Sequence, residues 1–371
     1  MSFSYWEQKS WLSNIDFTIV GSGITGLNCA LQLRRKYPEA KILVLERGIL
    51  SNGASTKNAG FACFGSLSEI IDDLQKHTEQ EVIDLVSRRN QGLQLLRSTL
   101  GDQAIKYEQY GGYELFLEED ASLFEACNSK LEYINELLKP VFNEDVFSIA
   151  KDTFGFKKVV QNYIFNKFEG QIDTGAMMQS LLYKVYAENI QILNSCEVEE
   201  FYDQGKNVIV KTKNFEFTTA KIFIATNGFA TKLGIDEVKP ARAQVIITTP
   251  IEDLDIKGTF HLDKGYYYFR NIDNRILFGG GRNLDFKAEE TTEMNQTSLI
   301  QNKLEEILKE VILPDRKFEI DHRWSGIMGV GVQKKPIVKQ LSDNVFCGVR
   351  LGGMGVAIGS LVGSELAKEL K

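Results

Sequence analysis

A glycine-rich hexapeptide follows an apolar, β-rich run near the start of the chain. The run is residues 17–20, and the hexapeptide is Gly21-Ser22-Gly23-Ile24-Thr25-Gly26. In this pattern the first glycine permits a tight turn, the second lets backbone N–H groups approach a pyrophosphate, and the third lets a helix pack closely on the strand. The positive N-terminal end of that helix attracts phosphate. The phosphate-binding residues expected from the pattern are Gly21, Gly23, Ile24, Thr25 and Gly26.

A carboxylate stands at the end of the next apolar run. Residues 42–45 are apolar throughout, as in a strand buried on both faces, and Glu46 follows Gly26 by 20 residues. A carboxylate at this position accepts hydrogen bonds from a ribose 2′-hydroxyl and repels a 2′-phosphate. We therefore expect Glu46 and its neighbour Arg47 to bind an adenine dinucleotide without that phosphate. An ordinary glycine turn is the alternative, and the motif alone leaves both NAD and FAD open.

Further motifs are spread over the rest of the chain. They are residues 53–60 (GASTKNAG), 170–173 (GQID), 225–228 (ATNG), 323–326 (RWSG) and 348–355 (GVRLGGMG). In this order they resemble the D-amino-acid oxidase and sarcosine/glycine oxidase superfamily of FAD enzymes, over nearly the whole chain. The resemblance favours FAD. A flavin disulfide reductase would need a redox-active cysteine pair, which the sequence lacks, and a plain NAD dehydrogenase would leave residues 348–355 without a role.

The resemblance implies contacts between these motifs and FAD. The residues implied to wrap the flavin side of FAD, where small side chains let the backbone approach the ring, are Ser55, Thr56, Lys57, Asn58, Ala59 and Gly60. Val198 lies where the family places a backbone contact to adenine. A positive helix end at the flavin pyrimidine edge would stabilise the anionic reduced flavin. The N–H groups at that edge come from Gly352, Gly353, Met354, Gly355 and Val356, and the remaining assigned contacts are Thr226, Gly228, Gly326 and Arg350.

A tyrosine-rich run, residues 265–270, resembles the family's strand that faces the flavin. Strand alternation places Tyr266, Tyr268 and Arg270 on one face. We expect Tyr268 to shape a substrate pocket and Arg270 to bind a carboxylate or another anion. His261, on a neighbouring predicted strand, is the third catalytic candidate. For the run and for His261 a purely structural role is the alternative.

Two departures from the family pattern narrow the chemistry. Several amino-acid-oxidising members carry an arginine two residues after the glycine of the Trp-x-Gly turn, where this chain has Met328. A simple α-amino acid held in that way is therefore disfavoured. Some oxidases place a lysine over the flavin where this chain has Leu277, which favours a dehydrogenase but leaves oxygen open as acceptor. Gly326 offers no cysteine where some members attach flavin covalently, so FAD is expected to bind non-covalently.

These observations predict hydride transfer from a C–H bond next to nitrogen to the flavin. The cofactor supplies the reactivity and the protein supplies placement and electrostatics. An amine that arrives uncharged needs no strong protein base, and no convincing base is visible. The expected substrate is an amine or an N-substituted amino acid, with oxygen or an electron carrier as acceptor. Alternatives are oxidation of a 2-hydroxy acid with His261 as base, and a flavin-binding protein without turnover.

The elements that must position these residues alternate between strand and helix. Helices are predicted after residues 17–20, near 174–187 and at the C-terminus, with closely spaced strands between 242 and 281. This order predicts an α/β fold: a Rossmann-like, glutathione-reductase-like FAD-binding domain with a parallel sheet, interrupted by an antiparallel-sheet α+β substrate domain. The FAD-binding domain is assigned residues 1–75, 155–232 and 322–371, and the substrate domain residues 76–154 and 233–321.

Composition excludes several other classes of protein. The net charge of −7 and the absence of a long apolar run argue against nucleic acid as partner and against a membrane span. The five cysteines lie far apart, so neither a disulfide framework nor a metal site is expected. These features are most simply those of a cytoplasmic enzyme.

Overall fold

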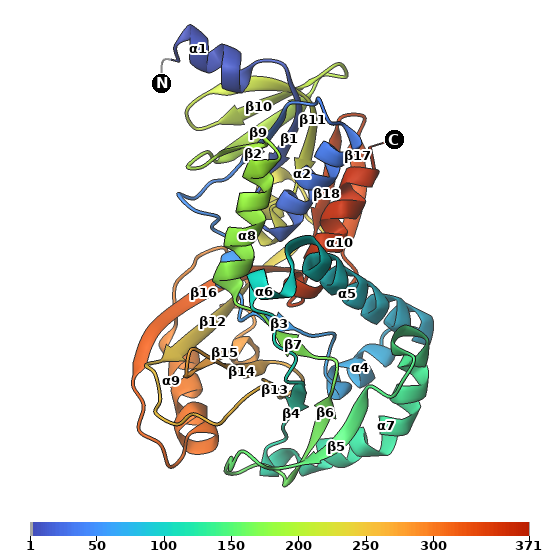
Figure 1. The fold of residues 1–371 in the computed structure, drawn as a ribbon, viewed down its shortest axis with the longest axis vertical. Helices are drawn as coiled ribbons and strands as arrows, with labels where there is room; N and C mark the ends of the chain where they lie inside the picture. The colour runs from blue at the N-terminus through green and yellow to red at the C-terminus, as the bar shows by residue number, and fades with distance from the viewer. Residues whose placement is uncertain (1–2, 371) are drawn as a thin grey trace.

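Two large β-sheets organise the molecule, and Figure 1 shows them in opposite halves of its long axis. The structure, a computed structural model, describes residues 3–370. A third, two-stranded sheet joins β3 (Phe61–Ala62) to β7 (Gly170–Gln171) between the two halves. None of the helices in residues 3–370 has the length and apolar character needed to cross a bilayer.

The first large sheet, which we call the parallel sheet, has the order β17-β18-β11-β1-β2-β8, with β10 pairing β11 and β9 beyond it. Its strands are β1 (Ile15–Val20), β2 (Ile42–Leu45), β8 (Gln191–Leu193), β9 (Val198–Asp203), β10 (Val208–Thr212), β11 (Glu216–Ile224), β17 (Ile337–Ser342) and β18 (Val345–Val349). The central pairs from β18 to β8 are parallel, whereas β17, β9 and β10 pair antiparallel at the sides. Parallel strands need crossovers, and helices supply them.

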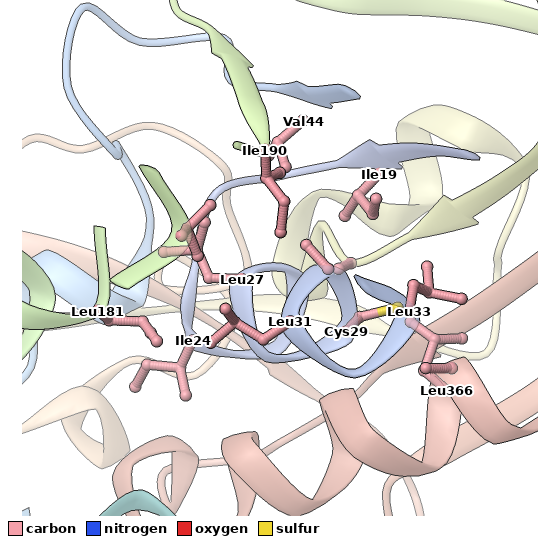
Figure 2. Close-up of a cluster of buried hydrophobic side chains, with 14 of the residues drawn as sticks. Ile19, Ile24, Leu27, Cys29, Leu31, Leu33, Val44, Leu181, Ile190 and Leu366 are labelled. Carbon is pink, nitrogen blue, oxygen red and sulfur yellow. The ribbon is translucent and has the colours of Figure 1, made fainter. Parts of the chain in front are cut away.

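Helices pack on the parallel sheet through apolar faces and glycines. They are α2 (Ile24–Lys36), α8 (Thr174–Ala187) and α10 (Gly355–Lys368), with α5 (Glu79–Leu100) alongside α10. Figure 2 shows Leu27 and Leu31 of α2 packed among side chains of the neighbouring strands and helices. A Cβ on Gly363 of α10 would collide with the Thr25 backbone carbonyl. Only a glycine therefore allows the middle of α10 to lie this close to the start of α2.

The second large sheet, the inserted sheet, has the order β16-β12-β15-β14-β13-β4-β6-β5. Its strands are β4 (Gly112–Glu114), β5 (Phe147–Lys151), β6 (Asn162–Asn166), β12 (Lys239–Thr248), β13 (Thr259–Leu262), β14 (Tyr267–Ile272), β15 (Arg275–Gly280) and β16 (Ile320–Val330). All its pairs are antiparallel except β13–β4, which is parallel. The remaining helices are α1 (Tyr5–Glu7), α3 (Ala54–Lys57), α4 (Leu67–Leu74), α6 (Asp102–Ile105), α7 (Ala121–Phe142) and α9 (Ser298–Ile307).

The pairing of two strands moves the expected domain boundaries. Residues 155–232 and 322–371 were assigned to the FAD-binding domain, but β6 pairs with β4 and β5, and β16 pairs along β12 as far as Val330. Both strands therefore belong to the inserted sheet. Strand partners that are distant in sequence decide this membership, and a local hydrophobic pattern does not reveal them.

Candidate active site

A cavity of about 600 Å³ is lined by residues from both large sheets. It extends from the N-terminus of α2 to the face of the inserted sheet, past α3 and the start of α10. Most of the residues assigned from the sequence line it. Those that do not are Gly26, Thr56, Gly60, Gly228 and Arg270.

The N-terminus of α2 opens into the cavity through glycines. Gly21 has φ +105°, and a Cβ there would sit 2.9 Å from the Ala225 carbonyl oxygen. Gly23, the N-cap, has no side chain to cap the helix, and the Ile24 N–H donates to Ser55 Oγ at 2.9 Å. Because the first N–H groups of a helix lack intrahelical acceptors, this turn offers donors to an anion. Gly26 is buried against Gly21, where it permits the close packing expected of it.

Glu46 is held firmly at the end of β2. Its Oε2 accepts from the N–H and the hydroxyl of Ser22, at 3.2 and 2.6 Å, and its Oε1 accepts from Gly48 N and Asn52 N, at 2.8 and 3.2 Å. The residue is 5% exposed and lines the cavity. A carboxylate has about four acceptor positions, and these four donors occupy them, so a ribose hydroxyl would have to replace one of the protein donors.

The neighbouring residue, Arg47, closes the same end of the cavity. Its guanidinium lies 3.5 Å from the centroid of the Phe229 ring and donates to the Asn52 carbonyl at 2.9 Å. Val198 lines the cavity next to it. An apolar wall with a fixed cation is suited to a flat aromatic base such as adenine.

The start of α10 is a second uncapped helix N-terminus in the cavity. Its N-cap, Met354, makes no side-chain capping bond. The preceding loop is held by Asn227, whose Oδ1 accepts from Arg350 N and Leu351 N at 3.1 Å each. Gly352 has φ +61° and open space where a Cβ would be. The backbone N–H groups at this helix start are therefore open to the cavity, and their contact with a flavin edge stays a prediction.

The opposite wall is formed by aromatic side chains of the inserted sheet. His261 of β13 and Tyr268 of β14 are direct register partners and both line the cavity. Phe61 makes edge contacts with both rings, at centroid distances of 5.3 and 5.6 Å. Phe61, His261 and Tyr268 therefore form one aromatic group facing the cofactor end.

His261 is ion-paired below this surface. Its Nε2 lies 2.8 Å from Oε2 of Glu169, and the two residues are 5% and 1% exposed. Burial disfavours the charged ring, but the charge and hydrogen bond of Glu169, with smaller effects of Glu69 and Glu114, raise the pKa of His261 to about 9. The imidazole is therefore protonated at neutral pH and does not act as a base there.

Tyr268 keeps a free hydroxyl. Its ring lies across Gly279 of β15, where a Cβ would be 2.7 Å from the ring. Burial raises the pKa of Tyr268 to about 12, although the charge of Arg282 opposes this. Within residues 3–370 the hydroxyl has no hydrogen-bond partner, so it remains a neutral donor facing the cavity.

Arg270 differs from its expected role as an anion-binding residue. The side chain is 2% exposed, does not line the cavity, and donates to the backbone carbonyls of Ala59 and Ile172. These donors fix the small sheet β3–β7 onto the inserted sheet, and burial lowers the pKa of the guanidinium to about 10. Strand alternation put Arg270 on the correct face, but the segment packed against that face covers it.

Two substitutions noted in the sequence occupy different places. Met328 lines the cavity from β16. Leu277 packs with Ala59 and Val245 beneath the surface and does not line it. The Trp324 indole N–H donates to the Lys57 carbonyl at 3.0 Å, which ties β16 to α3.

Three residues of this wall were not identified from the sequence: Phe61, Glu169 and Arg282. Phe61 directly follows the glycine motif 53–60, and its position was a usable signal. Glu169 directly precedes the motif 170–173, but nothing local connects it with His261. Arg282 follows the Gly279-Gly280-Gly281 run that ends β15, and its orientation depends on tertiary packing.

Fold and cavity together define an α/β protein in which a second, inserted sheet covers a cavity at the helix N-termini of the first. A family model described as FAD dependent oxidoreductase matches residues 16–369. The chain belongs to this family, as the resemblance predicted. Among curated relatives, the gamma-glutamylputrescine oxidoreductase of Escherichia coli (strain K12) is 24% identical over 390 residues, 96% of this chain and 83% of that protein. A probable oxidoreductase, OrdL, of Haemophilus influenzae is 20% identical over 388 residues, 97% and 83%.

Solved structures share the fold at low sequence identity. Glycine oxidase from Geobacillus kaustophilus has a TM-score of 0.75 at 17% identity, with 96% of this chain and 94% of that chain covered. L-proline dehydrogenase from P. horikoshii has a TM-score of 0.74 at 17% identity, with 96% and 92% covered. The likeness confirms the predicted α/β fold class.

Proposed function

We propose that this chain binds FAD non-covalently and oxidises the C–N bond of an amine or an N-substituted amino acid. The named relatives and structural neighbours act on γ-glutamylputrescine, glycine and proline, all of which carry such a bond. The cofactor-binding assignments that line the cavity remain part of this proposal, whereas Arg270 as an anion-binding residue does not. The acceptor, oxygen or an electron carrier, is left open.

The cavity fits FAD at each of its parts. The uncapped start of α2 suits the pyrophosphate, Glu46 the ribose, and the start of α10 the flavin pyrimidine edge. Thr226 lines the cavity and its buried Oγ1 has no partner within residues 3–370, so a ligand oxygen would satisfy it. Bound FAD would supply the hydride acceptor.

The protonation states of the titratable side chains on the inserted-sheet wall carry the proposal; the carboxylates Glu69 and Asp72, which also line the cavity, belong to α4. His261 is held as a cation by Glu169, Tyr268 is a neutral phenol, and burial raises the pKa of Cys63 well above its ordinary value. An uncharged amine has its own lone pair and needs no proton removed from nitrogen before hydride transfer. A hydroxyl substrate does need a base, so the pairing of His261 with Glu169 disfavours the 2-hydroxy-acid alternative.

The chain's own residues then bind, orient and shield the substrate. Phe61 and Tyr268 bound the reacting region and exclude water, while the Tyr268 hydroxyl donates to an acceptor atom of the substrate. Near-attack geometry needs reacting atoms about 3–3.5 Å apart. The hydrogen bonds of Arg270 to the Ala59 and Ile172 carbonyls, and the ion pair of His261 with Glu169, hold this wall in place.

Anaerobic reduction of the reconstituted protein tests the proposal. The protein is loaded with FAD and mixed with butylamine, proline, iminodiacetate, glycine or lactate while the visible flavin bands are recorded. At least one amine is expected to bleach the bands, and lactate is not. Failure to bind FAD, or bleaching by lactate alone, would overturn the proposal. When the protein is precipitated with acid, non-covalently bound FAD should be released and colour the supernatant yellow. Covalently bound flavin would stay in the precipitate instead.

A further inference from the structure

Arg282 differs from the other arginines that line the cavity. Arg47, Arg89 and Arg350 each donate to a backbone carbonyl. Within residues 3–370 the guanidinium of Arg282 makes no hydrogen bond and has no carboxylate within 4.0 Å. Arg282 is half-buried and lines the cavity. Its N–H donors are therefore open to an acceptor that enters the cavity.

Aromatic rings hold Arg282 in place without using its donors. Its Cζ lies 5.5 Å from the Tyr266 ring centroid and 5.1 Å from that of Phe286. A cation–π contact of this kind holds a guanidinium near the rings and leaves its N–H donors free. The backbone of Arg282 is also held, because the residue begins a short 3-10 helix (Arg282–Leu284) directly after β15. A fixed planar fork is the geometry that binds a carboxylate in bidentate fashion.

The Tyr268 hydroxyl points toward the same part of the wall. A Cβ on Gly279 of β15 would sit 2.9 Å from Tyr268 Oη, so the ring reaches from β14 across β15. The chain then continues from β15 through Gly280 and Gly281 to Arg282. A free phenol and a free guanidinium are both donors, and together they match an oxyanion.

Two carboxylates of α4, Glu69 and Asp72, also line the cavity. Glu69 lies against Gly265, the neighbour of Tyr266, and raises the pKa of His261. Asp72 pairs with Lys76 at 2.7 Å. Neither carboxylate lies within 4.0 Å of the Arg282 guanidinium, so both leave its N–H donors free.

We propose that Arg282, assisted by the Tyr268 hydroxyl, binds a carboxylate of the substrate from the end of β15. The family pattern described in the sequence analysis has an arginine at the Met328 position, on β16; in this chain the cation would instead follow β15. The reacting C–N bond in this inference rests on the proposed function, whereas the carboxylate site does not. The substrate class is narrowed to amines that also carry an anionic group.

Binding of butyrate to the FAD-loaded protein tests this site directly. Affinity is measured by calorimetry and by perturbation of the flavin absorbance at low ionic strength, with the neutral isostere butyramide as comparison. Arg282→Gln should lower the affinity for butyrate by about tenfold or more, because a hydrogen bond to a charged group is lost. Arg282→Lys should retain part of that affinity, and the affinity for butyramide should change little in either variant. Arg275→Gln is the matched control, because Arg275 pairs with Asp321 away from the cavity.

The outcomes separate this inference from the proposed function. Equal butyrate affinity in wild type and Arg282→Gln, no butyrate binding to wild type, or parallel loss of butyramide would each overturn the carboxylate site. Butyrate binding that depends on Arg282, without bleaching by any amine, would keep the site and reject amine oxidation. Bleaching by an amine, together with the same butyrate affinity in wild type and Arg282→Gln, would support amine oxidation and reject the carboxylate site.

Discussion

The two ends of the cavity are built from different parts of the chain. At the N-terminus of α2 the ligand-facing groups are backbone N–H groups, exposed by Gly21 and Gly23. On the inserted sheet they are side chains, chiefly Phe61, Tyr268 and Arg282. The first end depends on the path of the backbone and the second on how segments pack together.

This difference explains which side chains remain available for a ligand. On the inserted sheet, His261 and Arg270 have suitable chemistry but are occupied by Glu169 and by backbone carbonyls. Arg282 has the same chemistry and is free. Residue type alone therefore identifies donors, while packing decides which of them can meet a substrate.

A branched side chain at Gly23 should have the largest effect, because it blocks the backbone end. Gly23→Val directs carbon at Ser55 Oγ, already 2.8 Å from an ideal Cβ, and into the path of the phosphates. FAD affinity should fall by about 100-fold or more. The loss is measured by fluorescence titration with FAD.

The control for that loss is Gly175→Ala in α8, away from the cavity, where an added Cβ meets only Asp173 Oδ1 at 3.3 Å. It should bind FAD as wild type does. Unchanged FAD affinity in Gly23→Val would mean that the backbone end does not meet phosphate.

Removal of the Arg270 guanidinium should lower the stability of the fold, and not only the affinity for substrate. Arg270→Gln leaves the buried Ala59 and Ile172 carbonyls without these donors. The free energy of unfolding in urea should drop by about 2–4 kcal/mol. Arg275→Gln, which removes a half-buried ion pair and a hydrogen bond to the Thr248 carbonyl, should lower it by less than Arg270→Gln does, because only one backbone carbonyl loses a donor. Normal stability with a selective loss of substrate affinity would restore Arg270 as a ligand-binding residue.

The His261–Glu169 pair should make stability depend on pH. The pKa of His261 is raised to about 9 from 6.5, so its contribution is full below pH 6.5 and is lost as pH rises to about 9. The predicted loss is at most about 3 kcal/mol. Urea unfolding at pH 6 and pH 9 should show this decline in wild type but not in His261→Gln. The same slope in both proteins would exclude the pair as its source.

Loss of the Tyr268 hydroxyl should have the smallest effect. Tyr268→Phe keeps the ring against Phe61 and Gly279, so the free energy of unfolding should change by less than about 0.5 kcal/mol. Butyrate affinity should weaken several-fold, equivalent to about 1 kcal/mol for one hydrogen bond. A large loss of stability would show instead that the hydroxyl has a structural partner.

Much of the backbone end was predictable. The spacing from residue 17 to Glu46 placed β1, α2 and β2 correctly, and the C-terminal helix was predicted at 359–370, a start four residues later than that of α10. Each of these signals is local, because a glycine is required wherever backbone approaches backbone or ligand. Family membership and fold class followed from the same motifs and are confirmed.

The side-chain end was predictable only in part. Strand alternation placed Tyr268 correctly on the cavity face. It placed Arg270 on the same face, but that side chain is buried and does not line the cavity. The sequence also assigned β6 and β16 to the other domain, because their partners β4 and β12 lie far away along the chain.

The sequence by itself determined the strand–glycine–helix unit, the family and the chemistry class, since backbone geometry and hydrophobic period are properties of neighbouring residues. Tertiary structure alone decided that Glu169 forms an ion pair with His261 and that the Ala59 and Ile172 carbonyls accept hydrogen bonds from Arg270. It also decided that Arg282 lies near Tyr266 and Phe286, whose rings leave its N–H donors free. The physical reason is that a charged group becomes available to a ligand only when no closer acceptor, brought near by folding, has already taken its hydrogen bonds.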